Sequence, residues 1–172
     1  LIKELTSITP PGLNAAFLTN SGAEAVENSL KLALRKQKQA KYGISFEGAF
    51  HGRTLGALSL TNSKSIQKQN FFSIPTKRLP FSEQAIEKLE RILKQESSAS
   101  EIGFIIMEPM QGEGGHNIAP KKLVRELRKI TKNKSIPLIS DEVQAGRGRT
   151  GKWWAIQNFN VTPDIISSAK AL

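Results

Sequence analysis

Residues 104–107 read Phe104-Ile105-Ile106-Met107, a short unbroken apolar run in which two positions are β-branched. Such a run is typical of a strand that is buried on both faces of a sheet. A helical pattern precedes the run and another follows it, and their apolar stripes are Ile86, Leu89 and Leu93 after Ser82, and Leu123, Val124, Leu127 and Ile130 after Pro120. This order indicates crossover connections between parallel strands.

The same alternation extends toward both ends of the chain. The sequence predicts further strands over residues 42–46, 136–139 and 165–166, and Pro137 marks either an edge strand or the start of a strand. A helix is expected from Ser21 to about Lys38, with Ser21 as N-cap and Glu24 completing a capping box. We therefore predict an α/β fold with three layers, α/β/α, around a mostly parallel sheet.

Composition excludes several classes of protein. The chain has 172 residues, no cysteine and only two histidines, His51 and His116, so disulfide scaffolds, thiolate metal sites and cysteine nucleophiles are excluded and no metal site is expected. The apolar runs are too short for a membrane span, and the N-terminus does not resemble a signal peptide. We expect a cytoplasmic protein without a membrane partner.

The net charge of +10 raises the alternative of a basic nucleic-acid-binding module. The excess lies in two stretches, residues 29–43 and 119–135, that are both predicted to form amphipathic helices. Solvated outer faces explain such stretches, and they lack the interleaved aromatic residues that single-strand binders use. We therefore expect no nucleic-acid partner.

Polar residues follow four of the predicted strands. Acids, an aromatic residue, an arginine and a lysine come after Phe46, Met107, Ile139 and Ile166. Because ligands bind at the carboxyl ends of strands in open parallel sheets, these residues form a candidate site. A lone lysine after a strand is usually a surface residue, but partial burial at a strand end lowers an ammonium pKa and favours amine chemistry on a carbonyl.

If that carbonyl belongs to pyridoxal 5'-phosphate, the site needs an anion-binding turn, a carboxylate for the ring nitrogen and a flat side chain against the ring. Gly22 and Ala23 offer backbone N–H groups at a helix start, which favours a phosphate. Asp141 at a buried strand end can hold the ring nitrogen protonated, and Phe50 can stack on the ring. All three requirements have candidates.

Five stretches together resemble the ordered motifs of class III pyridoxal-phosphate aminotransferases. They are residues 20–25, 50–54, 108–114, 141–151 (Asp-Glu-Val-Gln, then Gly-Arg-Thr-Gly) and 163–170 (Pro-Asp-Ile-Ile-Ser-Ser-Ala-Lys). The resemblance covers about residues 13–172 and is closest to 4-aminobutyrate aminotransferases. It implies part of the fold type I large domain, a homodimer with shared active sites, and transfer of an ω-amino group from an amino acid to a 2-oxo acid such as 2-oxoglutarate. Acetylornithine or ornithine transamination, and racemisation, are the alternatives within the family.

The resemblance also implies a role for each matching residue. Lys170 matches the lysine that binds the cofactor and moves the substrate proton, and Asp141 matches the partner of the ring nitrogen. Gln144 resembles the partner of the ring's phenolic oxygen, while Val143 and Phe50 enclose the ring. The remaining matches are the phosphate-binding turn of Ser21, Gly22 and Ala23, the cofactor-site histidine His51, and two substrate-binding residues, Arg53 and Glu113.

Structural explanations stay open for several of these residues. Gly22 also suits a tight helix start, Phe50 a core position, and Arg53 a helix cap or an ion pair with Glu47. Glu108 is expected to be structural, Glu142 to hold a loop through a salt bridge, and both histidines to be neutral hydrogen-bonding groups.

The resemblance also bears on how much of a subunit the chain represents. Class III aminotransferases have, in addition, an N-terminal segment that lines the substrate pocket and a small C-terminal domain. Neither has a match in this sequence. We therefore expect residues 1–172 to be a fragment of the cofactor-binding large domain and to be inactive alone.

Overall fold

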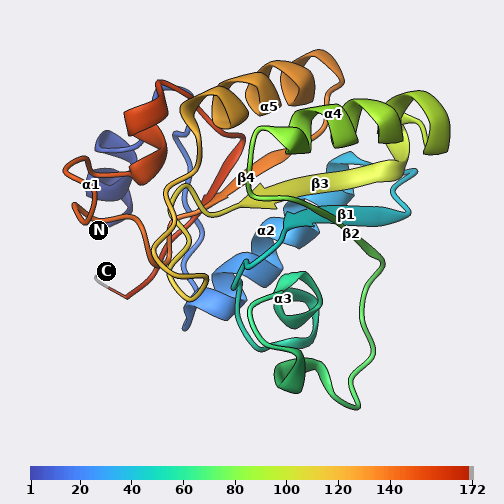
Figure 1. Ribbon diagram of the computed structural model, residues 1–172. Coiled ribbons are helices and arrows are strands. Elements are labelled where there is room, and N and C mark those ends of the chain that lie inside the picture. The colour runs from blue at the N-terminus through green and yellow to red at the C-terminus, as the bar shows by residue number, and fades with distance from the viewer. Residues whose placement is uncertain (171–172) are drawn as a thin grey trace.

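The computed structural model describes residues 1–170, which build one parallel five-stranded sheet in the order β2-β1-β3-β4-β5. The strands are β1 (Tyr42–Phe46), β2 (Thr76–Leu79), β3 (Ile102–Met107), β4 (Leu138–Asp141) and β5 (Ile165–Ser167). Helices α4 (Gln84–Arg91) and α5 (Lys121–Asn133) cover one face, and α2 (Gly22–Lys36) and α3 (Leu55–Leu60) cover the other (Figure 1). The α/β class and the three layers are confirmed.

The register brings the carboxyl ends of the strands to one rim. Met107 pairs with Ser140, and Asp141 pairs with Ser167. Pro137 immediately precedes β4, which lies between β3 and β5, so this proline marks a strand start and not an edge. The polar residues that follow β1, β3, β4 and β5 therefore gather at the rim, as the sequence predicts.

Helix α2 begins where the sequence places it. The Ser21 hydroxyl accepts a hydrogen bond from the Glu24 N–H, as an N-cap does. The Glu24 carboxylate accepts from the N–H of Asn20, one residue before the N-cap, so the reciprocal half of the capping box is shifted by one position. The helix ends at Lys36, two residues earlier than expected, because Gln37 leaves the helical conformation.

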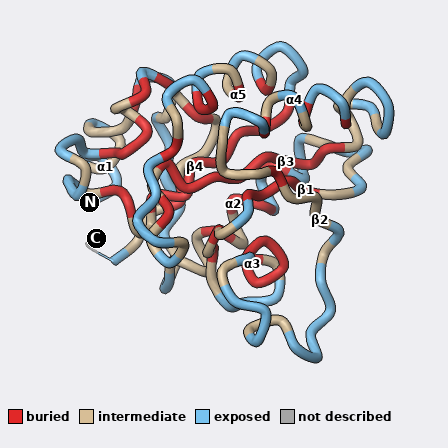
Figure 2. Tube along the Cα trace, in the orientation of Figure 1, coloured by how far each residue is buried: buried red, intermediate tan, exposed pale blue. Residues whose placement is uncertain are grey.

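Side chains of the sheet alternate between two apolar cores. Ile44, Phe46, Ile105, Met107 and Leu138 pack with α4, α5 and residues 154–161. The intervening positions pack with α2 and α3, through Phe104, Ile106 and Ile139. In Figure 2 the buried trace runs along the strands and the inner sides of the helices. Except at Ile102, at the irregular start of β3, the parity of a strand position decides which layer its side chain meets.

In the described part of the chain, two α-helices and one strand were not predicted from the sequence: α1 (Ile2–Ser7), α3 and β2. Strand β2 reads Thr-Lys-Arg-Leu and only Leu79 in it is buried, because it is an edge strand that pairs with β1 alone. Because its composition is polar, a search for apolar runs does not detect this strand. Helix α4 passes directly into a π-helical turn over Ile92–Glu96. None of the helices in the described part is both long and apolar enough to cross a membrane.

Candidate active site

Asp141 and His51 form a buried pair at the centre of the rim. The Asp141 Oδ2 atom lies 2.7 Å from His51 Nδ1, and both side chains are almost completely buried. Asp141 Oδ1 accepts a hydrogen bond from the Val143 N–H at 3.1 Å. The carboxylate is thus oriented by a ring that comes from the loop after β1, 90 residues earlier in the chain. His51 is a hydrogen-bonding residue, as expected, and its partner is Asp141.

Glu108, directly after β3, joins two loops of the rim. Its carboxylate accepts from the Phe50 N–H at 3.0 Å and from the Gly112 N–H at 3.3 Å. Burial is the main cause that raises the pKa of Glu108 to about 7; the nearby Asp141 carboxylate adds to the rise, while His51 and the two backbone hydrogen bonds oppose it. The contacts support the structural role that the sequence suggests, because Glu108 fixes the backbone at Phe50.

The start of α2 lies directly against this rim. A Cβ atom on Gly22 would lie 2.9 Å from Val143 Cγ1 and 3.3 Å from Ala169 Cβ. Only glycine therefore allows the helix to approach the segments after β4 and β5 so closely. Among residues 1–170, the backbone N–H groups of Gly22 and Ala23 have no hydrogen-bond partner. These two N–H groups, at the positive end of the helix, suit an anion.

Lys170 reaches the same place from the end of β5. Its Nζ atom donates to Gln144 Oε1 at 3.1 Å, and its backbone is in the left-handed region with φ of 64°. Gln144 in turn packs over Gly112, where a Cβ atom would lie 2.6 Å from the Gln144 side-chain carbonyl carbon. The structure thereby brings together Lys170, Gln144, Val143 and the start of α2, which are all predicted site residues.

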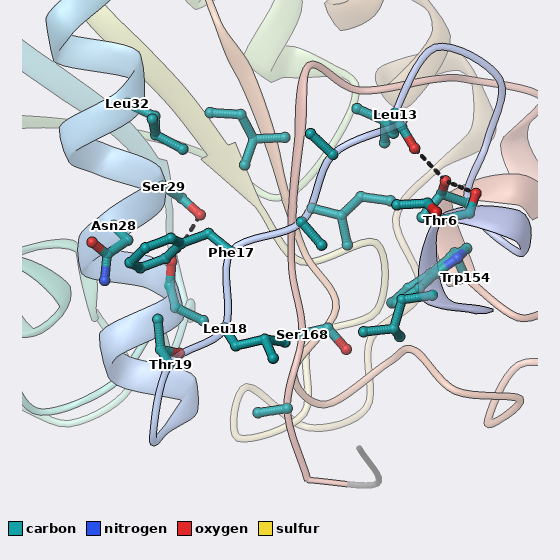
Figure 3. Close-up of a pocket in the computed structure, with 18 of the residues that line it drawn as sticks. Thr6, Leu13, Phe17, Leu18, Thr19, Asn28, Ser29, Leu32, Trp154 and Ser168 are labelled. Atoms are coloured by element: carbon teal, nitrogen blue, oxygen red, sulfur yellow. Dashed lines mark hydrogen bonds between the residues drawn. The ribbon is translucent and has the colours of Figure 1, made fainter. Parts of the chain in front are cut away.

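A cleft of about 460 Å³ opens beside this cluster (Figure 3). Asn28, Ser29 and Leu32 of α2 line one side, and Thr6 and Trp154 line the other. Of the predicted site residues, the cleft includes only Ser21 and Lys170. The cleft therefore does not contain Asp141, and Lys170 belongs both to its lining and to the cluster with Gln144.

The two predicted substrate-binding residues are both exposed. Arg53 lies on the loop before α3, and Glu113 lies in the turn after β3. Within the described residues, Arg53 does not form the alternative ion pair with Glu47, and Thr54, not Arg53, is the N-cap residue of α3. The structural explanations for Arg53 thus find no support, and its guanidinium is free to meet a ligand. Phe50 is half-buried on the same loop as Arg53.

The predicted salt bridge of Glu142 is not found in the described part of the structure. Its carboxylate forms no salt bridge within the described residues, but accepts hydrogen bonds from the N–H groups of Ala155 and Ile156 and from the Ser140 hydroxyl. These two N–H groups belong to the first two residues of the short helical segment Ala155–Phe159, which lies on the α4 and α5 side of the sheet. Burial raises the pKa of Glu142 to about 7. Two backbone donors hold the loop where an ion pair was predicted.

Comparisons with known proteins identify the family of the chain. The family model described as aminotransferase class-III matches residues 1–172. The chain belongs to the class III aminotransferase family. Members of this family use pyridoxal phosphate.

Two curated relatives and one solved structure show how far the likeness extends. An acetylornithine aminotransferase of Methanosarcina mazei is 40% identical over 98% of this chain and 40% of its own length. One of Methanopyrus kandleri is 38% identical over 98% of this chain and 41% of its own length. The crystal structure of a transaminase from the marine bacterium Virgibacillus matches with a TM-score of 0.90 and 29% identity, over 98% of this chain and 40% of that one. The class III chain described here thus spans about two fifths of the length of these relatives.

Proposed function

We propose that the protein to which residues 1–172 belong is a pyridoxal-phosphate-dependent ω-aminotransferase. Its donor is the terminal amine of N-acetylornithine, which becomes an aldehyde, and its acceptor is 2-oxoglutarate, which becomes glutamate. One observation carries the transaminase assignment: Lys170, Asp141 and the start of α2 come together at one rim from three distant parts of the chain.

The choice of donor rests on the relatives. The sequence motifs alone suggest 4-aminobutyrate, with acetylornithine as an alternative. Both curated relatives described above are named acetylornithine aminotransferase, at 40% and 38% identity. This favours the alternative donor over 4-aminobutyrate.

The residues present fit pyridoxal phosphate at its two ends. The N–H groups of Gly22 and Ala23 suit the phosphate, and the Ser21 hydroxyl lies beside them at the helix start. Asp141 is buried and negatively charged when ionised, so it suits a protonated ring nitrogen. When bound, the cofactor supplies an aldehyde that combines with amines and a ring that accepts electrons.

Each residue of the chain then has a defined task. Lys170 holds the cofactor through its Nζ atom and moves a proton to and from the reacting carbon of the substrate. Asp141 Oδ1 and Oδ2 keep a proton on the ring nitrogen, and His51 orients that carboxylate through its Nδ1 atom. Gln144, which accepts from Lys170 Nζ, orients the amine and binds the phenolic oxygen of the ring.

Other side chains exclude water and bind substrate. Val143 and Phe50 would enclose the ring of the bound cofactor and keep solvent from the reacting atoms. Arg53 receives a substrate carboxylate through paired hydrogen bonds, which its planar guanidinium favours. Glu113 would lie beside the amine and pair with a gating arginine from later in the same polypeptide, as the family resemblance implies.

We also propose that residues 1–172 form part of a cofactor-binding large domain and that two subunits share each active site. Arg53 and Glu113 are both exposed, so another part of the protein has to close the substrate site over them. This arrangement accounts for a site that is well formed around the cofactor and open around the substrate.

A panel of amino donors with the full-length protein tests the proposal. Purified protein with pyridoxal phosphate and 2-oxoglutarate is supplied with N-acetylornithine, ornithine, 4-aminobutyrate or lysine, and glutamate formation is measured. We expect kcat/KM to be highest for N-acetylornithine. A preference for 4-aminobutyrate would restore the donor that the motifs suggest, and no transfer from any amine would contradict the proposed function.

A further inference from the structure

Glu27 of α2 caps a different helix, α3. Its Oε1 atom accepts from the Thr54 hydroxyl at 2.6 Å and from the Ala57 N–H at 3.0 Å. Thr54 is the N-cap residue of α3 but makes no side-chain cap of its own. The Glu27 carboxylate therefore takes the place of a local N-cap, and its negative charge also favours a helix start.

The space for this contact is built into α3. A Cβ atom on Gly56 would lie 2.3 Å from Glu27 Oε2, so any other residue would displace the carboxylate. The contact joins two elements that lie 27 residues apart in the chain. It fixes the position of Thr54 relative to α2.

The far end of α3 is tied to the same loop. The Thr61 hydroxyl donates to the Gly52 carbonyl at 3.0 Å and accepts from the His51 N–H at 3.0 Å. A Cβ atom on Gly52 would lie 2.8 Å from Ala23 Cβ, so the loop packs directly on the first turn of α2. Residues 51–54 are thus held at both ends, and Arg53 lies between the two attachments.

Arg53 is the one residue of this loop that carries a positive charge, and it is exposed. Its guanidinium makes no ion pair in the part of the chain that the structure describes, so the position of its backbone decides which region the side chain can reach. Glu27 is the charged group that fixes the backbone at the next residue.

We propose that Glu27 is a positioning residue that sets the preference for carboxylate-bearing substrates. It holds Arg53 at a fixed distance from the start of α2, where the cofactor phosphate binds, and so fixes the distance between the substrate carboxylate and the reacting amine. This inference rests on the proposed function, in which Arg53 binds that carboxylate. Small errors in such a distance weaken catalysis strongly, because bound groups react only in the correct geometry.

The test uses the full-length holoenzyme and two measurements. One is kcat/KM for N-acetylornithine divided by kcat/KM for butylamine, which lacks a carboxylate, both from the first half-reaction so that no acceptor is involved. The other is the dissociation constant of glutarate, an unreactive dicarboxylate. We expect Glu27→Ala to lower the ratio and to weaken glutarate binding by about fivefold or more, with butylamine turnover within about twofold of the parent.

Graded variants keep the test decisive if Glu27→Ala folds poorly. Glu27→Gln retains an oxygen for the Ala57 N–H and should have a smaller effect, and Thr54→Val removes only the hydroxyl contact. The matched control is Glu90→Ala, an exposed glutamate of α4 without a hydrogen bond among the described residues. It should change neither measurement.

The outcomes separate this inference from the proposed function. Unchanged ratio and glutarate affinity in all Glu27 and Thr54 variants, with lowered thermal stability alone, would assign Glu27 to folding and overturn the inference while transamination stands. Failure of the parent protein to transfer any amine would overturn both. In the double variant with Arg53→Lys, the second change should add little to the first, because both act on the same contact.

Discussion

The two faces of the sheet use neighbouring carboxylates for different purposes. Asp141 points toward the α2 and α3 layer, where it meets His51 and lies near the start of α2. Glu142, the next residue, points toward the α4 and α5 layer, where it accepts from two backbone N–H groups. Both are buried at the same strand end. Burial of a carboxylate at a strand end therefore does not by itself indicate a catalytic role. The groups that hydrogen-bond to the carboxylate decide whether its role is catalytic or structural.

The hydrogen-bond partners of Glu142 and Asp141 differ in how much of each carboxylate they leave free to bind a ligand. Backbone donors and Ser140 occupy Glu142 from three directions, so it has a purely structural environment. Asp141 has one backbone donor and one ring that orients it. The α2 and α3 face should therefore govern activity, and the α4 and α5 face should govern stability.

Substitution of Lys170, on the side of the sheet that we expect to govern activity, should have the largest effect on turnover. Lys170→Ala should lower turnover by about 10²–10⁴-fold, the range for a positioned proton-transfer group, with little change in thermal stability. Borohydride reduction of the holoenzyme followed by peptide mapping should place the pyridoxyl group on Lys170. Labelling of another lysine, together with normal turnover by Lys170→Ala, would refute the assignment.

Asp141→Asn should have the next largest effect. An amide cannot stabilise a protonated ring nitrogen as a carboxylate does, so turnover should fall by about 10²-fold or more while cofactor still binds. The absorbance spectrum of the variant with pyridoxal phosphate checks binding, and steady-state kinetics check turnover. Turnover within a few-fold of the parent would make Asp141 as structural as Glu142.

Arg53→Lys should affect substrates selectively. Lysine keeps the charge but loses the paired hydrogen bonds, so KM for N-acetylornithine, for 2-oxoglutarate, or for both should rise on the order of tenfold. Amines without a carboxylate should react about as well as before. An equal loss of activity with both kinds of substrate would show that Arg53 has a role in folding and not in substrate recognition.

Glu142→Gln should have the smallest effect on activity and a visible effect on how stability depends on pH. In the unfolded chain this glutamate ionises near its ordinary pKa of 4.5, whereas burial raises the folded pKa to about 7. Between these values the folded state binds more protons, so this group's contribution to the free energy of unfolding falls as pH rises. Below about pH 4.5 the contribution is fully present, and above about pH 7 it is lost.

Denaturant unfolding of the parent and of Glu142→Gln at pH 5, 6, 7 and 8 measures this contribution. The parent's free energy of unfolding should fall more steeply between pH 5 and 7 than the variant's, by at most about 1.4 kcal/mol per pH unit. Specific activity of the folded variant should stay within a few-fold of the parent. Identical slopes, or a large loss of activity, would contradict the division between the two faces.

Sequence patterns predicted the elements that carry an apolar run or an apolar helix stripe. Strands β1, β3 and β5 and helices α2, α4 and α5 lie close to where the patterns place them, whereas β4 begins two residues later than predicted, after Pro137. They are predictable because burial of a strand or of a helix stripe depends on the periodicity of neighbouring residues. The edge strand β2 and the short helix α3 lack such a pattern, so only packing reveals them.

The sequence by itself determined the α/β class, the polar rim at the strand ends and the motifs that resemble class III aminotransferases. Only the tertiary structure decided that His51 orients Asp141, that Glu27 caps α3 beside Arg53, and that Glu142 binds backbone and not a cation. Local order follows from neighbours along the chain, whereas these contacts join residues from 13 to 90 positions apart. Such residues become neighbours only when loops that are distant in the chain pack together. The hydrogen-bond partners that this packing supplies decide whether a buried carboxylate has a catalytic or a structural role.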